Sequence, residues 1–203
     1  MTRWLAFGAI GAAVVAGGVN GYERATDPTP APSPPAATTD WGISPAEQHP
    51  IAPDELTADD VFQETATHEA GHVAASREFG IPVLEVTAEA SGNGKTTYPD
   101  HYFPDPKRDA YAYAVIDAAG EESAVAWLEQ RGYTHDRALA EEEPHANSDL
   151  DALRIDARQA GISVQEAHDQ ARRIVHDHRA AVDRTARALV ERGGYLNERE
   201  IDD

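Results

Sequence analysis

Hydrophobic positions recur with the period of an α-helix through residues 58–79, where one face collects small and aliphatic side chains. Thr57-Ala58-Asp59-Asp60 opens this stretch and resembles a capping box, with aspartate in place of the usual glutamate or glutamine. Gly80 and Pro82 follow at the positions where a helix C-terminus is expected. The pattern therefore predicts a helix over residues 58–79.

Two further stretches have the same period. Residues 109–131 carry a stripe of aromatic and aliphatic side chains, end before Gly132 and contain Gly120 as a candidate break. Ser163-Val164-Gln165-Glu166 is a clean capping box. It predicts one long helix that continues to Gly193-Gly194.

The segment between these two helices is acidic. Residues 133–146 include Glu141-Glu142-Glu143-Pro144 and are predicted to form a loop. Asn147 or Ser148 then caps a shorter helix, which we expect to end at Gly161.

Two short runs are typical of β-strands. These are Val83-Leu84-Glu85-Val86-Thr87 and Lys95-Thr96-Thr97-Tyr98, and Asn93-Gly94 between them is a strong signal for a tight hairpin turn. Together with the helices, they predict a mainly α fold with a small β-hairpin or sheet.

The N-terminal part of the chain is separate from these elements. Residues 1–22 contain an apolar run over residues 4–19, and we expect a signal peptide or a membrane anchor there. Positive charge before the run predicts a membrane-anchored or secreted protein whose domain is extracytoplasmic, with a cytoplasmic-facing anchor as the alternative. Residues 23–56 are rich in proline and alanine and predict a linker, which leaves residues 57–203 for the folded domain.

Composition restricts the partners and the chemistry. The chain has 203 residues and a formal net charge of −19. This charge repels phosphate backbones and anionic lipid surfaces, which argues against nucleic acid as a partner. Cysteine is absent, so disulfides and thiolate metal ligands are excluded.

The strongest chemical signal is the pentapeptide His68-Glu69-Ala70-Gly71-His72, in the middle of the first predicted helix. Histidines at i and i+4 lie on one helix face, so both imidazoles can bind one Zn²⁺ ion. The intervening Glu69 can act as general base on a zinc-bound water, whose pKa the metal lowers. The motif predicts a zinc-dependent peptidase.

A catalytic zinc needs a third protein ligand and one open coordination position. The motif does not identify this third ligand. Spacing nominates the following residues: Glu121, Glu122, His135, His145 and Asp149.

The chain from about residue 60 to 203 resembles the peptidase domain of the FtsH-type, ATP-dependent zinc metalloproteases. His68–Val73 is similar to the HEAGHA signature of that family, and Asn147–Leu153 is similar to its S-N-D-L-x-x-A segment. The resemblance implies a zincin-like helical metallopeptidase domain over residues 57–203. It also implies that Asp149 is the third zinc ligand.

The chain departs from that family in three ways. The stretch between the Asp149 helix and the last helix is shortened. Gly94-Lys95-Thr96 lacks the earlier glycine of a phosphate loop, because Glu89 stands there, so we expect no ATP binding. Ala119-Gly120-Glu121-Glu122 replaces the family's Gly-Gly-Arg-Ala element. A homo-oligomer is compatible with the resemblance, whereas processive, ATP-driven degradation is not expected.

The sequence therefore predicts a zinc metalloendopeptidase that hydrolyses unfolded or flexible polypeptides. One alternative is a membrane-tethered or secreted protein that binds zinc or polypeptides on the same fold without catalysis. Another is a gluzincin-like peptidase with Glu121 or Glu122 as the third ligand.

Overall fold

The computed structural model describes residues 55–202, without the side chains of residues 143–147 and 202. The predicted signal peptide or anchor (residues 1–22) and nearly all of the linker (residues 23–56) lie outside this range. Within it, no helix is both long enough and apolar enough to cross a bilayer. The described part is mainly helical with a small three-stranded antiparallel sheet, which confirms the predicted class.

Helix α1 (Ala58–Glu78) begins and ends as predicted. The Thr57 side chain accepts a hydrogen bond from the Asp60 amide (3.2 Å), and the Asp60 carboxylate accepts one from the Thr57 amide (3.1 Å). Gly80 follows the helix with a φ of 70°, a left-handed conformation that glycine adopts without strain. The capping box therefore sets the start of the helix that carries the motif.

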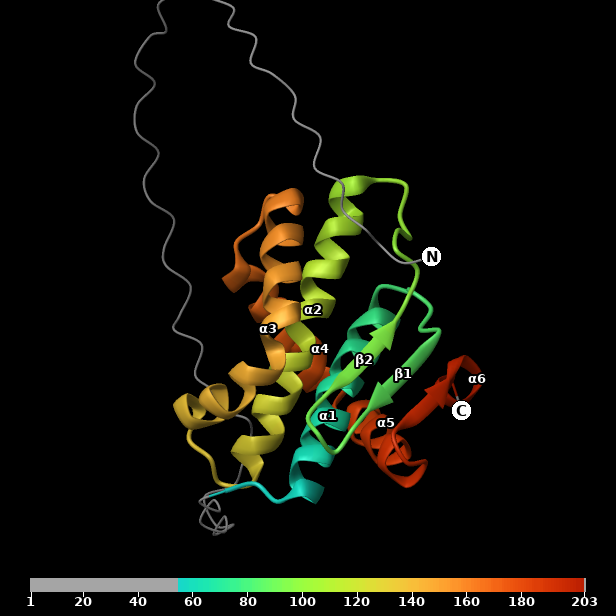
Figure 1. Cartoon of the computed structure of the whole chain (residues 1–203). Helices are drawn as coiled ribbons and strands as arrows, with labels where there is room; N and C mark the ends of the chain where they lie inside the picture. The colour runs from blue at the N-terminus through green and yellow to red at the C-terminus, as the bar shows by residue number, and fades with distance from the viewer. Residues whose placement is uncertain (1–54, 203) are drawn as a thin grey trace, which may run out of the picture. The chain divides into compact units, whose positions relative to one another are not determined.

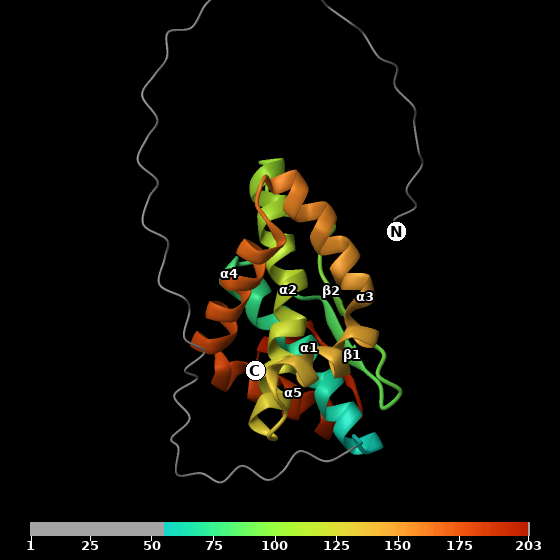
Figure 2. The same ribbon diagram turned by 90° about the vertical axis from the view of Figure 1, so that its left-hand side faces the viewer.

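Helix α2 (Pro106–Gln130) is the central element of the domain. It contacts α1, α3 (His135–Ala160) and α4 (Val164–Asp177), and most of its side chains are buried, which explains its apolar stripe. Figures 1 and 2 show it between these three helices. The helix continues without a break through Gly120.

Helix α3 contradicts the predicted loop over residues 133–146. It begins at His135, with Thr134 as its N-cap, and continues unbroken to Ala160, so neither Asn147 nor Ser148 caps a new helix. The helix packs mainly against α2, and buried residues recur along it at helical spacing: Ala138, Glu142, Leu153 and Ala157. Because one of these positions is a buried glutamate, the acidic composition concealed the helical pattern.

The predicted single helix from Ser163 to Gly193 is two helices. The capping box forms as expected, but α4 ends at Asp177, and α5 (Arg179–Glu191) begins after His178. Helix α4 packs mainly against α2, whereas α5 packs mainly against α1. The interruption at His178 lets one amphipathic segment cover two different helices.

The sheet has the strand order β2-β1-β3. Strands β1 (Glu85–Ala88) and β2 (Gly94–Thr97) pair antiparallel, as predicted, with Val86 opposite Thr96. The connection is a longer loop over residues 89–93, in which Gly92, and not Asn93-Gly94, has the positive φ of 85°. The predicted tight turn at Asn93-Gly94 is therefore wrong.

The third strand was not predicted. Strand β3 (Tyr195–Asn197) pairs antiparallel with β1 and leads into the short helix α6 (Glu198–Asp202). Its Leu196 is fully buried with Val86 in a core between α1, α5 and the sheet. A strand this short is stabilised by that packing more than by its own sequence pattern.

Helices α1 and α2 approach each other closely at Gly71. A Cβ atom at this position would lie 2.2 Å from the Ala119 carbonyl oxygen and 2.3 Å from Ser123 Oγ. Any larger residue would separate the two helices, because one of these atoms belongs to the backbone.

We predict that Gly71→Ala lowers the free energy of unfolding by about 1–3 kcal/mol, the usual cost of overpacking a core. Helix propensity alone would stabilise this variant by up to about 1 kcal/mol, so the two effects have opposite signs. Thermal and urea unfolding measure the change. An increase in stability would contradict the close packing at this residue.

Candidate metal centre

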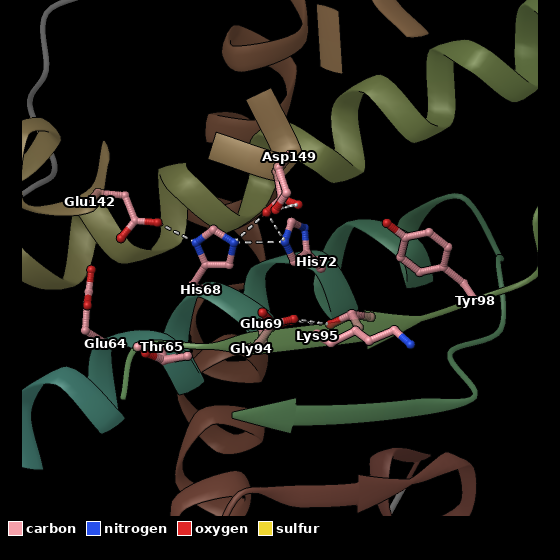
Figure 3. Close-up of a pocket in the computed structure, with 13 residues that line it drawn as sticks. Glu64, Thr65, His68, Glu69, His72, Gly94, Lys95, Tyr98, Glu142 and Asp149 are labelled. Atoms are coloured by element: carbon pink, nitrogen blue, oxygen red, sulfur yellow. Dashed lines mark hydrogen bonds and ion pairs between the residues drawn. The ribbon is translucent and has the colours of Figure 1, made fainter. Parts of the chain in front are cut away.

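The motif residues lie on the buried face of α1, where α2 and α3 cover them. His68 is 6% exposed, Glu69 4% and His72 4%. Figure 3 shows the two imidazoles side by side, with Asp149 on one side of them and Glu69 on the other, toward β2. The i, i+4 spacing thus brings the two rings together as predicted.

Asp149 of α3 joins the two histidines. Its Oδ2 lies 2.9 Å from His68 Nε2 and 3.2 Å from His72 Nε2, and the two Nε2 atoms are 3.0 Å apart. Among the described residues, these three form the one group of histidine and acidic side chains arranged to hold a metal ion. Three residues from two distant segments of the chain therefore supply one site.

The other nominated residues lie elsewhere or have other partners. Glu122 is buried but is paired with Arg172 (2.9 Å) and His168 (3.0 Å). His135 Nδ1 bonds Glu129 at 2.8 Å. Glu121 is not part of the metal-binding group among the described residues, and the side chain of His145 lies outside them.

The outward ring nitrogens of the two histidines are both occupied. His72 Nδ1 lies 2.7 Å from the Ile116 carbonyl oxygen, and His68 Nδ1 lies 2.5 Å from Glu142 Oε1. A carbonyl oxygen only accepts, so His72 Nδ1 must carry a proton; Glu142, as a carboxylate, imposes the same on His68. In the neutral rings, both Nε2 atoms then present lone pairs toward each other and toward Asp149.

Three acceptor atoms this close require a cation between them. Burial opposes ionisation of Asp149, but His68 and His72 hold its pKa well below its usual value. Burial alone would lower the pKa of His68, yet the Glu142 and Asp149 carboxylates raise it well above its usual value. Protons or a metal ion can supply the positive charge.

The donor set fits zinc. Two imidazole nitrogens and one carboxylate oxygen form a common catalytic zinc set. Ligand atoms about 2.0–2.1 Å from a tetrahedral ion are separated by about 3.3 Å, close to the distances found here. The outer partners, Glu142 and the Ile116 carbonyl, are of the kinds that normally orient zinc-bound histidines.

Glu69 faces the same pocket but is held by the sheet. Thr96 Oγ1 of β2 donates a hydrogen bond to Glu69 Oε2 (2.7 Å). A Cβ atom at Gly94 would lie 2.3 Å from Glu69 Oε1, so a larger residue on this strand would displace the Glu69 carboxylate. Burial raises the pKa of Glu69, although the two histidines oppose this. A carboxylate with a raised pKa is well suited to accept a proton.

Gly120 gives the two imidazoles their space. A Cβ atom at this position would lie 2.4 Å from His68 Nε2 and 2.6 Å from His72 Nε2. Gly120, a candidate helix break in the sequence, therefore does not break α2 but leaves space for the two imidazoles.

The pocket around the centre is mostly polar and acidic. It is lined by Glu64, Thr65, His68, Glu69, His72, Gly92, Gly94, Lys95, Thr96, Tyr98, Glu142, Ser148 and Asp149. Burial, reinforced by Glu142, raises the pKa of Glu64 to about 10. Burial also raises the pKa of Asp117 to about 8, although the nearby His72 opposes this.

Sequence reasoning missed several of these residues: Glu64, Thr96, Ile116, Gly120 and Glu142. Only Glu64 carried a usable signal, because it precedes His68 by one helical turn and lies on the same face. The others are brought to the site by α2, α3 and β2, whose placement the local pattern does not encode.

In comparisons with known proteins, no family model matches the chain, and no match to a curated protein is found.

We predict that Gly120→Ala weakens zinc binding by at least about 10-fold, because the added methyl group displaces one or both imidazoles. A competition titration against a chromophoric chelator measures the affinity. Gly161→Ala is the control, since it strains the left-handed C-cap of α3 without touching the pocket. Equal zinc affinity in the Gly120 variant and the wild type would contradict the packing described here.

Proposed function

We propose that the protein is a zinc-dependent metalloendopeptidase that hydrolyses flexible or unfolded polypeptides. The observation that carries the proposal is the convergence of His68, His72 and Asp149 in a pocket that Glu69 also lines. A binding site for structural zinc is usually closed by four protein ligands, whereas three ligands beside a carboxylate are typical of a hydrolytic centre.

Each residue has a defined part in this proposal. His68, His72 and Asp149 would hold the ion, and bound zinc would supply a Lewis acid that polarises the scissile carbonyl and makes water acidic. Glu69 takes the proton from the attacking water and passes it to the leaving amine. Thr96 holds the Glu69 carboxylate through its hydroxyl group during both transfers.

The sheet supports a polypeptide substrate. Strand β2 lies at the sheet edge, and Gly94, Lys95 and Thr96 of this strand line the pocket. An extended chain can pair with such an edge through its backbone, which favours unfolded segments over folded ones. The proposal includes a zincin-like fold of the FtsH type without the ATPase module, acting outside the cytoplasm.

We predict that Glu69→Gln binds zinc like the wild type but loses at least about 100-fold in kcat/KM for casein, because the amide cannot accept the proton. Zinc content and casein cleavage are measured on the same preparations. Glu198→Gln, at an exposed residue of α6, is the matched control. Zinc binding with no cleavage in the wild type would instead favour the non-catalytic zinc- or polypeptide-binding alternative.

We predict that Asp149→Ala lowers zinc affinity by more than about 100-fold, beyond the loss usual for an outer partner of a ligand. Glu122→Ala should keep its zinc and lose thermal stability, because it leaves Arg172 and His168 without their carboxylate. The opposite result, with zinc lost only in the Glu122 variant, would support the gluzincin-like alternative.

A further inference from the structure

Two glutamates are buried together behind His68. Glu64 of α1 and Glu142 of α3 are each 1% exposed, and both line the pocket. Figure 3 shows the Glu64 side chain below Glu142, on the far side of His68 from Asp149. Neither residue is needed to hold zinc or to move the proton in the proposed reaction, so their burial needs another explanation.

A pair of buried carboxyl groups cannot carry two negative charges without a nearby cation. As a carboxylate, Glu64 would have no hydrogen-bond donor for either oxygen among the described residues. As a neutral acid, it can donate a hydrogen bond to Glu142, which lies beside it in the pocket. The proton therefore belongs on Glu64, and the charge on Glu142.

The charge on Glu142 has a direct consequence for His68. Its Oε1 lies 2.5 Å from His68 Nδ1, which fixes a proton on that nitrogen and leaves the Nε2 lone pair directed at Asp149 and His72. By contrast, His72 Nδ1 donates its hydrogen bond to an uncharged group, the carbonyl oxygen of Ile116. The two ligands are thus held differently, and His68 is the more basic one.

We propose that Glu142 is a positioning residue for His68, and that Glu64 holds Glu142 in place as a neutral hydrogen-bond donor. The pair sets the orientation and basicity of one zinc ligand without touching the ion. This inference rests on the zinc site of the proposed function but not on its catalytic step.

We predict different effects on zinc affinity when each of the two glutamates is replaced by glutamine. Glu142→Gln removes the charge, so zinc affinity should fall about 10- to 100-fold. Glu64→Gln replaces one neutral donor with another of similar shape, so its affinity should stay within about threefold of the wild type. Glu141→Gln, at the neighbouring half-exposed position of α3, is the matched control and should have wild-type affinity.

Zinc affinity and stoichiometry are measured on the full-length chain by competition titration. NMR of the zinc-loaded wild type adds a readout that needs no variant: the Nδ1 proton of His68 should be present and protected from exchange with solvent. Wild-type affinity in Glu142→Gln, equal losses in both variants, or an unprotected His68 Nδ1 would each overturn the proposal.

Two other outcomes would also overturn the proposal. A second zinc equivalent that Glu64→Gln abolishes would show that the two carboxylates hold a cation rather than a proton. A wild type that binds no zinc would also overturn the proposal, because His68 would then have no ion for which Glu142 could position it. Casein cleavage is assayed separately, so a wild type that binds zinc without cleaving would refute the peptidase and leave the positioning role intact.

Discussion

The structure depends on three acceptor atoms brought together in a mostly buried pocket. Two imidazole nitrogens and one carboxylate oxygen lie within 3.2 Å of one another, and the outer nitrogen of each ring is already bonded. Without positive charge between them, this arrangement would be repulsive in a buried environment. The arrangement is therefore suited to bind a cation, and zinc is the ion that two imidazole nitrogens and one carboxylate oxygen favour.

Glycine is what lets the scaffold close around this site. Gly71 brings α1 against α2, Gly120 leaves space for the imidazoles, and Gly94 lets β2 reach the Glu69 carboxylate. At each position an added methyl group would clash with a neighbouring atom, so that the neighbour would have to move. The centre is consequently assembled from helices and a strand rather than from loops, which favours a fixed geometry.

The sequence allowed the parts with local signals to be predicted. The capping boxes at Thr57 and Ser163, the first two strands and the paired histidines all depend on neighbours within a few residues. Asp149 came from a family resemblance, and the structure places its carboxylate beside both rings. The buried Glu142 was assigned to a loop, because an acidic helix face that packs inward looks solvent-exposed in a sequence. Strand β3 and the interruption at His178 depend on long-range packing, which no local pattern records.

Anomalous diffraction at the zinc absorption edge, from crystals of the zinc-loaded protein, would locate the bound metal. We expect one peak bounded by His68 Nε2, His72 Nε2 and Asp149 Oδ2, with metal–ligand distances of about 2.0–2.2 Å and a solvent-facing fourth position. A zinc peak elsewhere, or an Asp149 carboxylate turned away from the ion, would contradict this expectation.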